Sequence, residues 1–228
     1  DGIEIRVDAG HRHGVSSQSS AAARREAKAL FADAGLAISS IATSVKFAQA
    51  DETAFQKQVD AAKANLDLAA DLGAPVVRIF AGGDSYPALT DAAADRVAAA
   101  FDIAGAYARG SGSCPMLECG HDIVTGGAEG AAVIRRVTTD TFCVLWNRCF
   151  IDDATYDALQ PHIRHFHLHD QVLDPADTSI LKLAQRMSKV NYQGFISLEI
   201  IKGVNLPEAQ LRETATRLQQ QIREGSAA

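Results

Sequence analysis

The sequence has 228 residues, of which 47% are hydrophobic, an ordinary content for a globular protein with one large or two small domains. Its 22 Lys and Arg residues and 28 Asp and Glu residues give a net charge of −6, which argues against a basic surface for nucleic acids. Because no apolar stretch approaches the roughly 20 residues that cross a bilayer, and no signal peptide is recognisable, we expect a cytoplasmic protein with a small-molecule partner and no membrane contact.

Strand-like and helix-like segments alternate along the chain. The predicted strands span residues 2–7, 37–42, 76–80, 115–119, 142–147, 164–169 and 195–200. The predicted helices span residues 20–34, 91–109, 128–136, 154–159, 180–190 and 207–222, with a further long helix between Asp51 and Gly73. In that long helix Asp51 is a suitable N-cap and Gly73 a suitable end.

This alternation requires parallel strands joined by right-handed crossovers, in either an open doubly wound sheet or a closed barrel. Most predicted strands have a polar residue at or near the carboxyl end, and no glycine-rich phosphate loop follows the first strand. We therefore predict a single α/β domain over residues 1–228, a TIM (β/α)8-type barrel. Since seven strands are one fewer than such a barrel has, we infer that the first strand is missing from this sequence.

Four of these strands have, at or near the carboxyl end, a residue that can bind a metal ion, namely Glu118, Asn147, His167 and Glu199. Side chains alternate along a strand, so residues of one parity face the barrel lumen. The apolar face of 164–169 must pack under the helices, which turns its histidines inward. The same test places these residues in the lumen: Glu4, Arg6, Arg78, Met116, Glu118, Leu145, Asn147, His165, His167, His169, Ser197 and Glu199.

The four cysteines do not have zinc-site spacing. The pairs Cys114/Cys119 and Cys143/Cys149 have four and five intervening residues and straddle predicted strands, whereas zinc pairs usually sit closer together in tight turns. We expect free thiols.

Several segments together resemble the sugar phosphate isomerase/epimerase group of xylose isomerase-like barrels, which includes the apurinic endonuclease family 2 type. They are GIEIR, AGLAISSIAT, AADLGAPVVRIFAGG, LECGHDIVTGG, VLWN, HFHLHD and NYQGFISLE, in this order. The resemblance implies a divalent metal, Mn²⁺ or Mg²⁺, held by residues that correspond to Glu118, Asn147, His167 and Glu199.

Two positions depart from the family pattern. Relatives have Asp where this chain has Asn147, and a neutral amide oxygen should bind a hard cation more weakly than a carboxylate. Relatives usually have Lys in place of His169, and a longer glycine-containing loop than the stretch from Asp170 to Ile180. Asp170 is a candidate to orient a ligand histidine.

The resemblance implies isomerisation or epimerisation of a sugar or sugar derivative by metal-assisted proton transfer between two glutamates, Glu118 and Glu199. The expected contacts to a sugar or polyol substrate are Arg6, His13, Arg78, His121 and His169. A homo-oligomer is compatible with the family.

Other readings stay open. Glu118 and Glu199 can instead form structural salt bridges with Arg6 and Arg78, and His165, set deeper on its strand, is expected to be structural. A barrel whose metal site has decayed would act as a binding or assembly subunit, which Asn147 favours. A cyclic-polyol (inosose-type) dehydratase uses similar chemistry. DNA repair at abasic sites is disfavoured by the acidic balance.

Overall fold

The chain folds into seven parallel strands with helices between them. The computed structural model describes residues 1–82, 85–148, 150–200 and 206–227. The strands are β1 (Gly2–Arg6), β2 (Ala37–Lys46), β3 (Val76–Phe80), β4 (Cys114–Cys119), β5 (Cys143–Asn147), β6 (Ile163–Leu168) and β7 (Phe195–Leu198). Each strand pairs in parallel with the next one in the chain, in the order β1 to β7. The predicted TIM barrel is confirmed.

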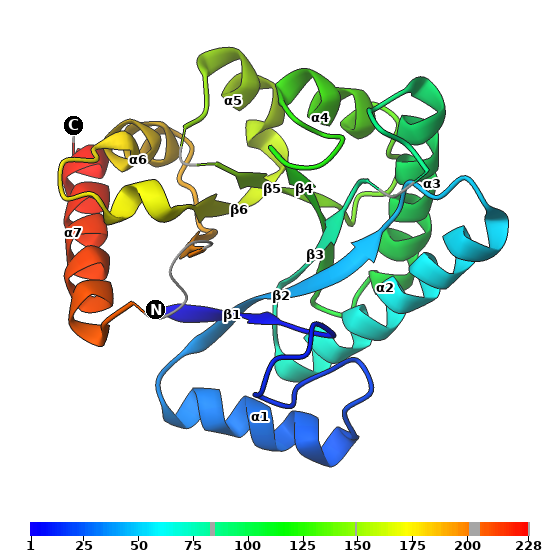
Figure 1. The fold of residues 1–228 in the computed structure, drawn as a ribbon, viewed down its shortest axis with the longest axis horizontal. Coiled ribbons are helices and arrows are strands. Elements are labelled where there is room, and N and C mark those ends of the chain that lie inside the picture. The colour runs from blue at the N-terminus through cyan, green and yellow to red at the C-terminus, as the bar shows by residue number, and fades with distance from the viewer. Residues whose placement is uncertain (83–84, 149, 201–205, 228) are drawn as a thin grey trace.

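The helices surround the strands on the outside of the barrel, as Figure 1 shows. They are α1 (Ala21–Asp33), α2 (Glu52–Leu72), α3 (Asp91–Ala108), α4 (Gly127–Ile134), α5 (Asp153–Leu159), α6 (Ser179–Lys189) and α7 (Glu208–Ala227). Two short 3-10 helices, η1 (Gln160–His162) and η2 (Asp170–Leu173), flank β6. As predicted, the Asp51 side chain caps α2 by accepting a hydrogen bond from the Ala54 amide, and Gly73 ends the helix with φ of 80°.

Some predicted element ends were wrong. The strand β2 continues four residues beyond Ala42 to Lys46, because Thr43 bonds to the backbone of β3 and Val45 is buried in the core. Helix α7 continues beyond Ile222 to Ala227, where Gly225 lies against the backbone of α6. The strand β7 ends at Leu198 rather than Ile200. The 3-10 turn η2, which starts at Asp170, was not predicted.

The buried apolar residues form two clusters, one between the strands and the helices and one inside the lumen. The larger one contains residues such as Val77, Leu117 and Phe166, which point from the strands toward the helices. A small second cluster of Val76, Met116, Cys143 and Leu145 fills part of the lumen. The alternation along each strand therefore leaves the inward positions near the carboxyl ends to polar side chains.

The strands β1 and β7 are the two edges of this sheet, because among the described residues no backbone pairing joins them. They approach through side chains: a Cβ atom added at Gly2 would lie 3.0 Å from the Phe195 ring and 2.9 Å from the Ala37 carbonyl oxygen. A residue without a side chain is needed at position 2 for this close approach.

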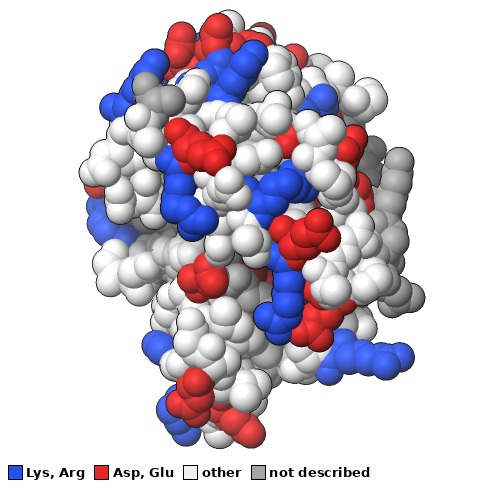
Figure 2. Space-filling view, turned by 90° about the vertical axis from the view of Figure 1, so that its left-hand side faces the viewer, with Lys and Arg blue, Asp and Glu red and all other residues white. Residues whose placement is uncertain are grey.

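Charged side chains of both signs are mixed on the surface. Figure 2, which looks at the side that faces left in Figure 1, shows Lys and Arg interspersed with Asp and Glu. On α7, for example, Arg212 pairs with Glu208 at 2.6 Å. Among the described residues, no helix is both long and apolar enough to span a membrane.

Candidate functional site

Polar residues from five strands converge at the carboxyl-terminal end of the barrel. They are Glu4, Arg78, Glu118, Asn147, His165 and His167, joined by His169 and Glu199 directly after β6 and β7. In parallel barrels this end carries the active site, because the strand ends and the following loops meet there. The contacts between these residues confirm the predicted inward orientation of the strand positions.

Glu118 lies deep in the lumen between an arginine and an amide. It is 2% exposed, and its Oε2 lies 3.3 Å from Arg78 Nη1. The Asn147 side-chain amide donates a short hydrogen bond to Glu118 Oε1. Burial raises the pKa of Glu118, although the positive charge of Arg78 opposes this. A carboxyl group in such surroundings is suited to holding a proton.

His167 lies between two carboxylates from opposite edges of the sheet. Its Nε2 donates to Glu4 Oε2 at 3.1 Å, and its Nδ1 is 3.3 Å from Glu199 Oε2, an ion-pair distance without hydrogen-bond geometry. Burial lowers the pKa of His167, but Glu199 and Glu4 outweigh it and raise the pKa to about 9. The His167 interaction in turn lowers the pKa of Glu199. Glu118 and Glu199 therefore sit in opposite electrostatic environments.

His169 joins the two halves of the site. Its Nε2 contacts Asn147 Oδ1 through a short hydrogen bond and lies 3.3 Å from Glu199 Oε2. Burial lowers the pKa of His169. An unbroken chain of contacts thus runs from Glu118 through Asn147 and His169 to Glu199 and on to His167. Asp170, the predicted orienting residue, is partly buried and begins η2 right after His169.

The predicted site residues omitted one participant, Glu4. Its Oε2 contacts His167 and lies 3.8 Å from His165 Nε2, and His167 outweighs burial to lower the Glu4 pKa to about 2. His165 also shares a 2.6 Å hydrogen bond with Ser197 Oγ. The signal was present in the sequence: the parity of β1 already placed the Glu4 carboxylate in the lumen, where an unpaired charge is costly.

Some donor atoms in this region lie close enough together that they could hold a metal ion. One ligand atom each from Glu4, His165 and His167 lie within 4.8 Å of one another. In addition, His167 Nδ1, Glu199 Oε2 and Glu118 Oε2 are buried without a hydrogen-bond partner among the described residues. Imidazole nitrogens and carboxylate oxygens suit divalent cations. Two sets of residues thus have donor atoms suited to a divalent ion, and His167 belongs to both.

The remaining predicted substrate contacts lie at the rim. The Arg6 guanidinium bonds to the Thr43 carbonyl oxygen and, at 2.9 Å, to Ser44 Oγ. His13 is exposed and bonds to the Arg6 carbonyl oxygen at 2.8 Å. His121 is exposed, with its ring 5.4 Å from the ring of Phe80. These groups surround the polar cluster without belonging to its chain of contacts.

The structural salt-bridge reading holds for one pair. Arg78 does pair with Glu118, whereas Glu199 is 3.3 Å from both His167 and His169, and Arg6 bonds to β2. Cys114, Cys119 and Cys143 are free thiols, as expected, and Cys149 lies outside the described residues.

A parallel barrel with carboxylates and histidines gathered at the carboxyl ends of its strands has the architecture of a TIM-barrel enzyme. Residues 1–221 match the family model for the xylose isomerase-like TIM barrel, so the chain belongs to this family. No curated protein matches the sequence significantly.

Solved structures with the same fold include sugar epimerases. A 3-keto-D-glucoside 4-epimerase from E. coli is 14% identical, with a TM-score of 0.73, over 88% of this chain and 85% of that chain. A D-psicose 3-epimerase from Clostridium cellulolyticum H10 is 12% identical, with a TM-score of 0.74, over 91% of this chain and 85% of that chain. A barrel from Mycobacterium smegmatis, solved in complex with magnesium, is 17% identical, with a TM-score of 0.68, over 92% of this chain and 80% of that chain.

Proposed function

We propose that this protein is a sugar or sugar-derivative isomerase or epimerase that moves a proton at a carbon next to a carbonyl group. The observation that carries the proposal is the chain of contacts joining Glu118 on β4 to Glu199 after β7 through Asn147 and His169. Such a reaction requires one group that removes a proton and another that supplies one. The sugar epimerases among the structures of the same fold support the reaction class.

Glu118 and Glu199 are the proposed proton-transfer groups. Glu199 is 35% exposed and sits beside two imidazoles, so it can reach a substrate bound over the strand ends. Glu118 is held from behind by Arg78 and Asn147, which fix its carboxyl group in one orientation. A fixed geometry of this kind is what efficient proton transfer needs. Arg6, His13, Arg78, His121 and His169 are proposed to bind the hydroxyl groups of the sugar.

We also propose that Glu118, Asn147, His167 and Glu199 hold a divalent cation, Mn²⁺ or Mg²⁺. When bound, such an ion polarises the carbonyl and hydroxyl oxygens of a substrate. Glu4 accepts a hydrogen bond from His167 Nε2 and so fixes the orientation of the imidazole ring. Asn147 contributes a neutral oxygen in place of a charge, which makes the site less negative.

Deuterium exchange tests this function directly. The protein is incubated in D₂O with ketoses, hydroxypyruvate or inosose, with Mn²⁺, with Mg²⁺ or with EDTA, and NMR follows the hydrogens next to the carbonyl. We expect exchange at one such carbon of a ketose in the presence of metal. Loss of the proton-transfer group in Glu199→Gln should slow exchange at least about 100-fold.

The matched control is Glu26→Gln, the same change at an exposed position of α1, which should exchange at the wild-type rate. Thermal unfolding of each variant shows that it is folded. Exchange that is undiminished in Glu199→Gln would contradict the assignment of Glu199.

A catalytically impaired barrel that serves as a binding subunit is the second candidate. The Arg78–Glu118 ion pair and the neutral Asn147 favour it, because both reduce the negative charge available to a cation. A protein that takes up no Mn²⁺ in equilibrium dialysis and exchanges no proton in any of the compounds above would support this candidate. Exchange confined to inosose, with loss of water, would instead identify a dehydratase.

A further inference from the structure

A second hollow lies at the opposite end of the barrel from the polar site. The first residues of β3 to β7 all line it, namely Val76, Cys114, Cys143, Ile163 and Phe195. Its volume is about 650 Å³, within the range of roughly 300–1,000 Å³ typical of small-molecule sites. Because the strands are parallel, the two ends do not share a mouth. This cavity is therefore separate from the site around His167.

Aromatic rings form much of its wall. Phe142, Tyr156, Phe166, Tyr192 and Phe195 all line the cavity. Rings of this kind cover flat apolar ligands with little loss of side-chain freedom. A ligand with an aromatic body matches these walls better than a polyhydroxylated sugar.

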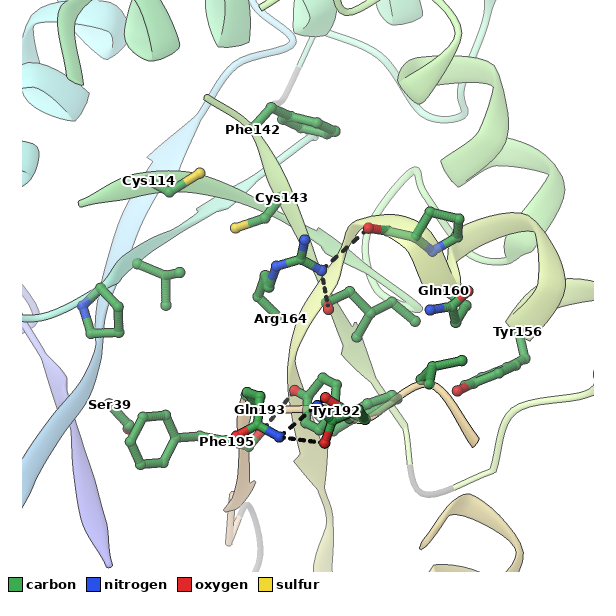
Figure 3. Close-up of a pocket in the computed structure, with 18 of the residues that line it drawn as sticks. Ser39, Cys114, Phe142, Cys143, Tyr156, Gln160, Arg164, Tyr192, Gln193 and Phe195 are labelled. Carbon is green, nitrogen blue, oxygen red and sulfur yellow. Dashed lines mark hydrogen bonds between the residues drawn. The ribbon is translucent and has the colours of Figure 1, made fainter. Parts of the chain in front are cut away.

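One cation, Arg164, lines the cavity. Its Nη1 donates to the carbonyl oxygens of Pro161 at 3.2 Å and Ile163 at 2.9 Å, bonds that are drawn in Figure 3. Arg164 is exposed, and among the described residues its Nε and Nη2 atoms make no hydrogen bond, so both are open to solvent and to a ligand. The one acidic residue in the lining, Asp140, is paired with Arg109 at 3.3 Å. Since Asp140 already faces Arg109, Arg164 is the charged group of the lining that is available to an anion.

Two further groups in the cavity are the hydroxyl of Ser39, which lacks a hydrogen-bond partner among the described residues, and the thiol of Cys114, whose pKa is lowered. Ser39 is 1% exposed, yet its Oγ has no hydrogen-bond partner among the described residues. A buried hydroxyl without a partner is costly and often marks a missing ligand or water. The neighbouring Cys143 thiol and the charge of Arg164 lower the pKa of Cys114, against the opposing effect of burial. This shift is consistent with an environment that stabilises negative charge.

We propose that this cavity binds a small aromatic carboxylate, with Arg164 pairing with the carboxylate and the aromatic side chains covering the ring. The N–H groups at Nε and Nη2 of Arg164 are available to donate to the two oxygens of a carboxylate, because a guanidinium group and a carboxylate have matching geometries. Ser39 supplies a hydrogen bond to a polar substituent of the ligand. The site is independent of the proposed sugar chemistry.

Calorimetric titration with benzoate, 4-hydroxybenzoate and benzamide tests the site. Benzamide has the shape of benzoate without its charge, so it should bind at least tenfold more weakly. Arg164→Met should weaken benzoate binding at least tenfold, whereas Arg25→Met, the same change on the exposed face of α1, should leave it unchanged. Equal affinities for benzoate and benzamide, or no saturable binding of either carboxylate, would overturn the proposal, even if Arg164→Met failed to fold.

Alkylation of Cys114 locates the ligand. Saturating benzoate should slow the reaction of Cys114 with iodoacetamide at least fivefold, as measured by mass spectrometry of the peptide that contains it. Glu199→Gln should bind benzoate like the wild type and show the same protection, which separates this site from the proposed active site. Binding that leaves Cys114 fully reactive, or that Glu199→Gln abolishes, would place the ligand elsewhere and refute the inference.

Discussion

At the scale of single residues, Asn147 is the neutral side chain that links Glu118 to His169 in the polar site. Its amide donates to Glu118 and its oxygen accepts from His169. In Asn147→Asp the donated hydrogen bond is lost, and a second carboxylate faces the buried Glu118. We expect the metal-free variant to lose about 1–3 kcal/mol of unfolding free energy, the usual cost of a buried polar group left without its partner.

The same substitution should strengthen cation binding, because a carboxylate binds Mn²⁺ better than an amide oxygen does. The measurement is the melting temperature with and without 1 mM Mn²⁺, a concentration chosen to exceed the dissociation constant of a typical site. Added Mn²⁺ should raise the melting temperature of the variant more than that of the wild type. Asn191→Asp, at an exposed turn, is the control and should not change the response. An equal metal response in Asn147→Asp and wild type would count against the proposed ligand set.

Cys114 should be the most acidic of the three described thiols. The neighbouring Cys143 thiol and the charge of Arg164 lower its pKa, whereas burial raises the pKa of Cys143 and Cys119. Since the thiolate is the reactive form, alkylation of Cys114 should be half-maximal at a lower pH than alkylation of an ordinary thiol. Removing the neighbouring thiol in Cys143→Ala should shift the pH–rate profile of Cys114 to higher pH. An unchanged profile would show that Cys143 does not lower the pKa of Cys114.

At the scale of elements, Gly105 fixes how closely α3 packs on the barrel. A Cβ atom there would lie 2.5 Å from the Thr141 carbonyl oxygen, which cannot move without shifting the backbone. Alanine is favoured over glycine inside a helix by about 1 kcal/mol, so a surface position would gain from this change. We expect Gly105→Ala to lower the melting temperature because the steric conflict outweighs the helix preference.

Gly130 of α4 provides the matched comparison. A Cβ atom there would meet the end of the Leu159 side chain at 2.7 Å, and a flexible side chain can move aside. Gly130→Ala should therefore cost less than Gly105→Ala in chemical denaturation. The opposite order would show that the loop at Thr141 adjusts more easily than the α4–α5 contact.

The sequence predicted the order of the elements better than their ends. Strand parity and helix caps are local signals, and the positions of Asp51 and Gly73 at the ends of α2 agree with them. The extension of β2 to Lys46 depends on hydrogen bonds to β3, and that of α7 depends on Gly225 packing against α6. Both are tertiary contacts that a local pattern does not contain.

The same distinction applies to the site. Parity placed Glu118, Asn147, His167 and Glu199 in one lumen, because alternation is a property of each strand alone. It could not show that Glu118 turns to Arg78, nor that Glu4 reaches His167 across the edges of the sheet. Those choices depend on the register and separation of strands far apart in the chain.

At the scale of the whole molecule, the two edge strands should be the least protected part of the barrel. The strands β1 and β7 each have a paired neighbour on one side only, whereas β4 is paired on both sides. Ile3 on β1 is 39% exposed, while Leu117 on β4 is fully buried. An amide that lacks a strand partner exchanges through smaller local openings.

Hydrogen–deuterium exchange measured by mass spectrometry checks this expectation in the 228-residue chain. Peptides from β1 and β7 should exchange at least about tenfold faster than those from β3, β4 and β5, because their local opening costs less free energy. Contacts such as that between Gly2 and the Phe195 ring hold the edges together through side chains, and side-chain packing protects amides less than a strand ladder does. Equal protection of β1 and β4 would show that the seam between β1 and β7 is closed in solution.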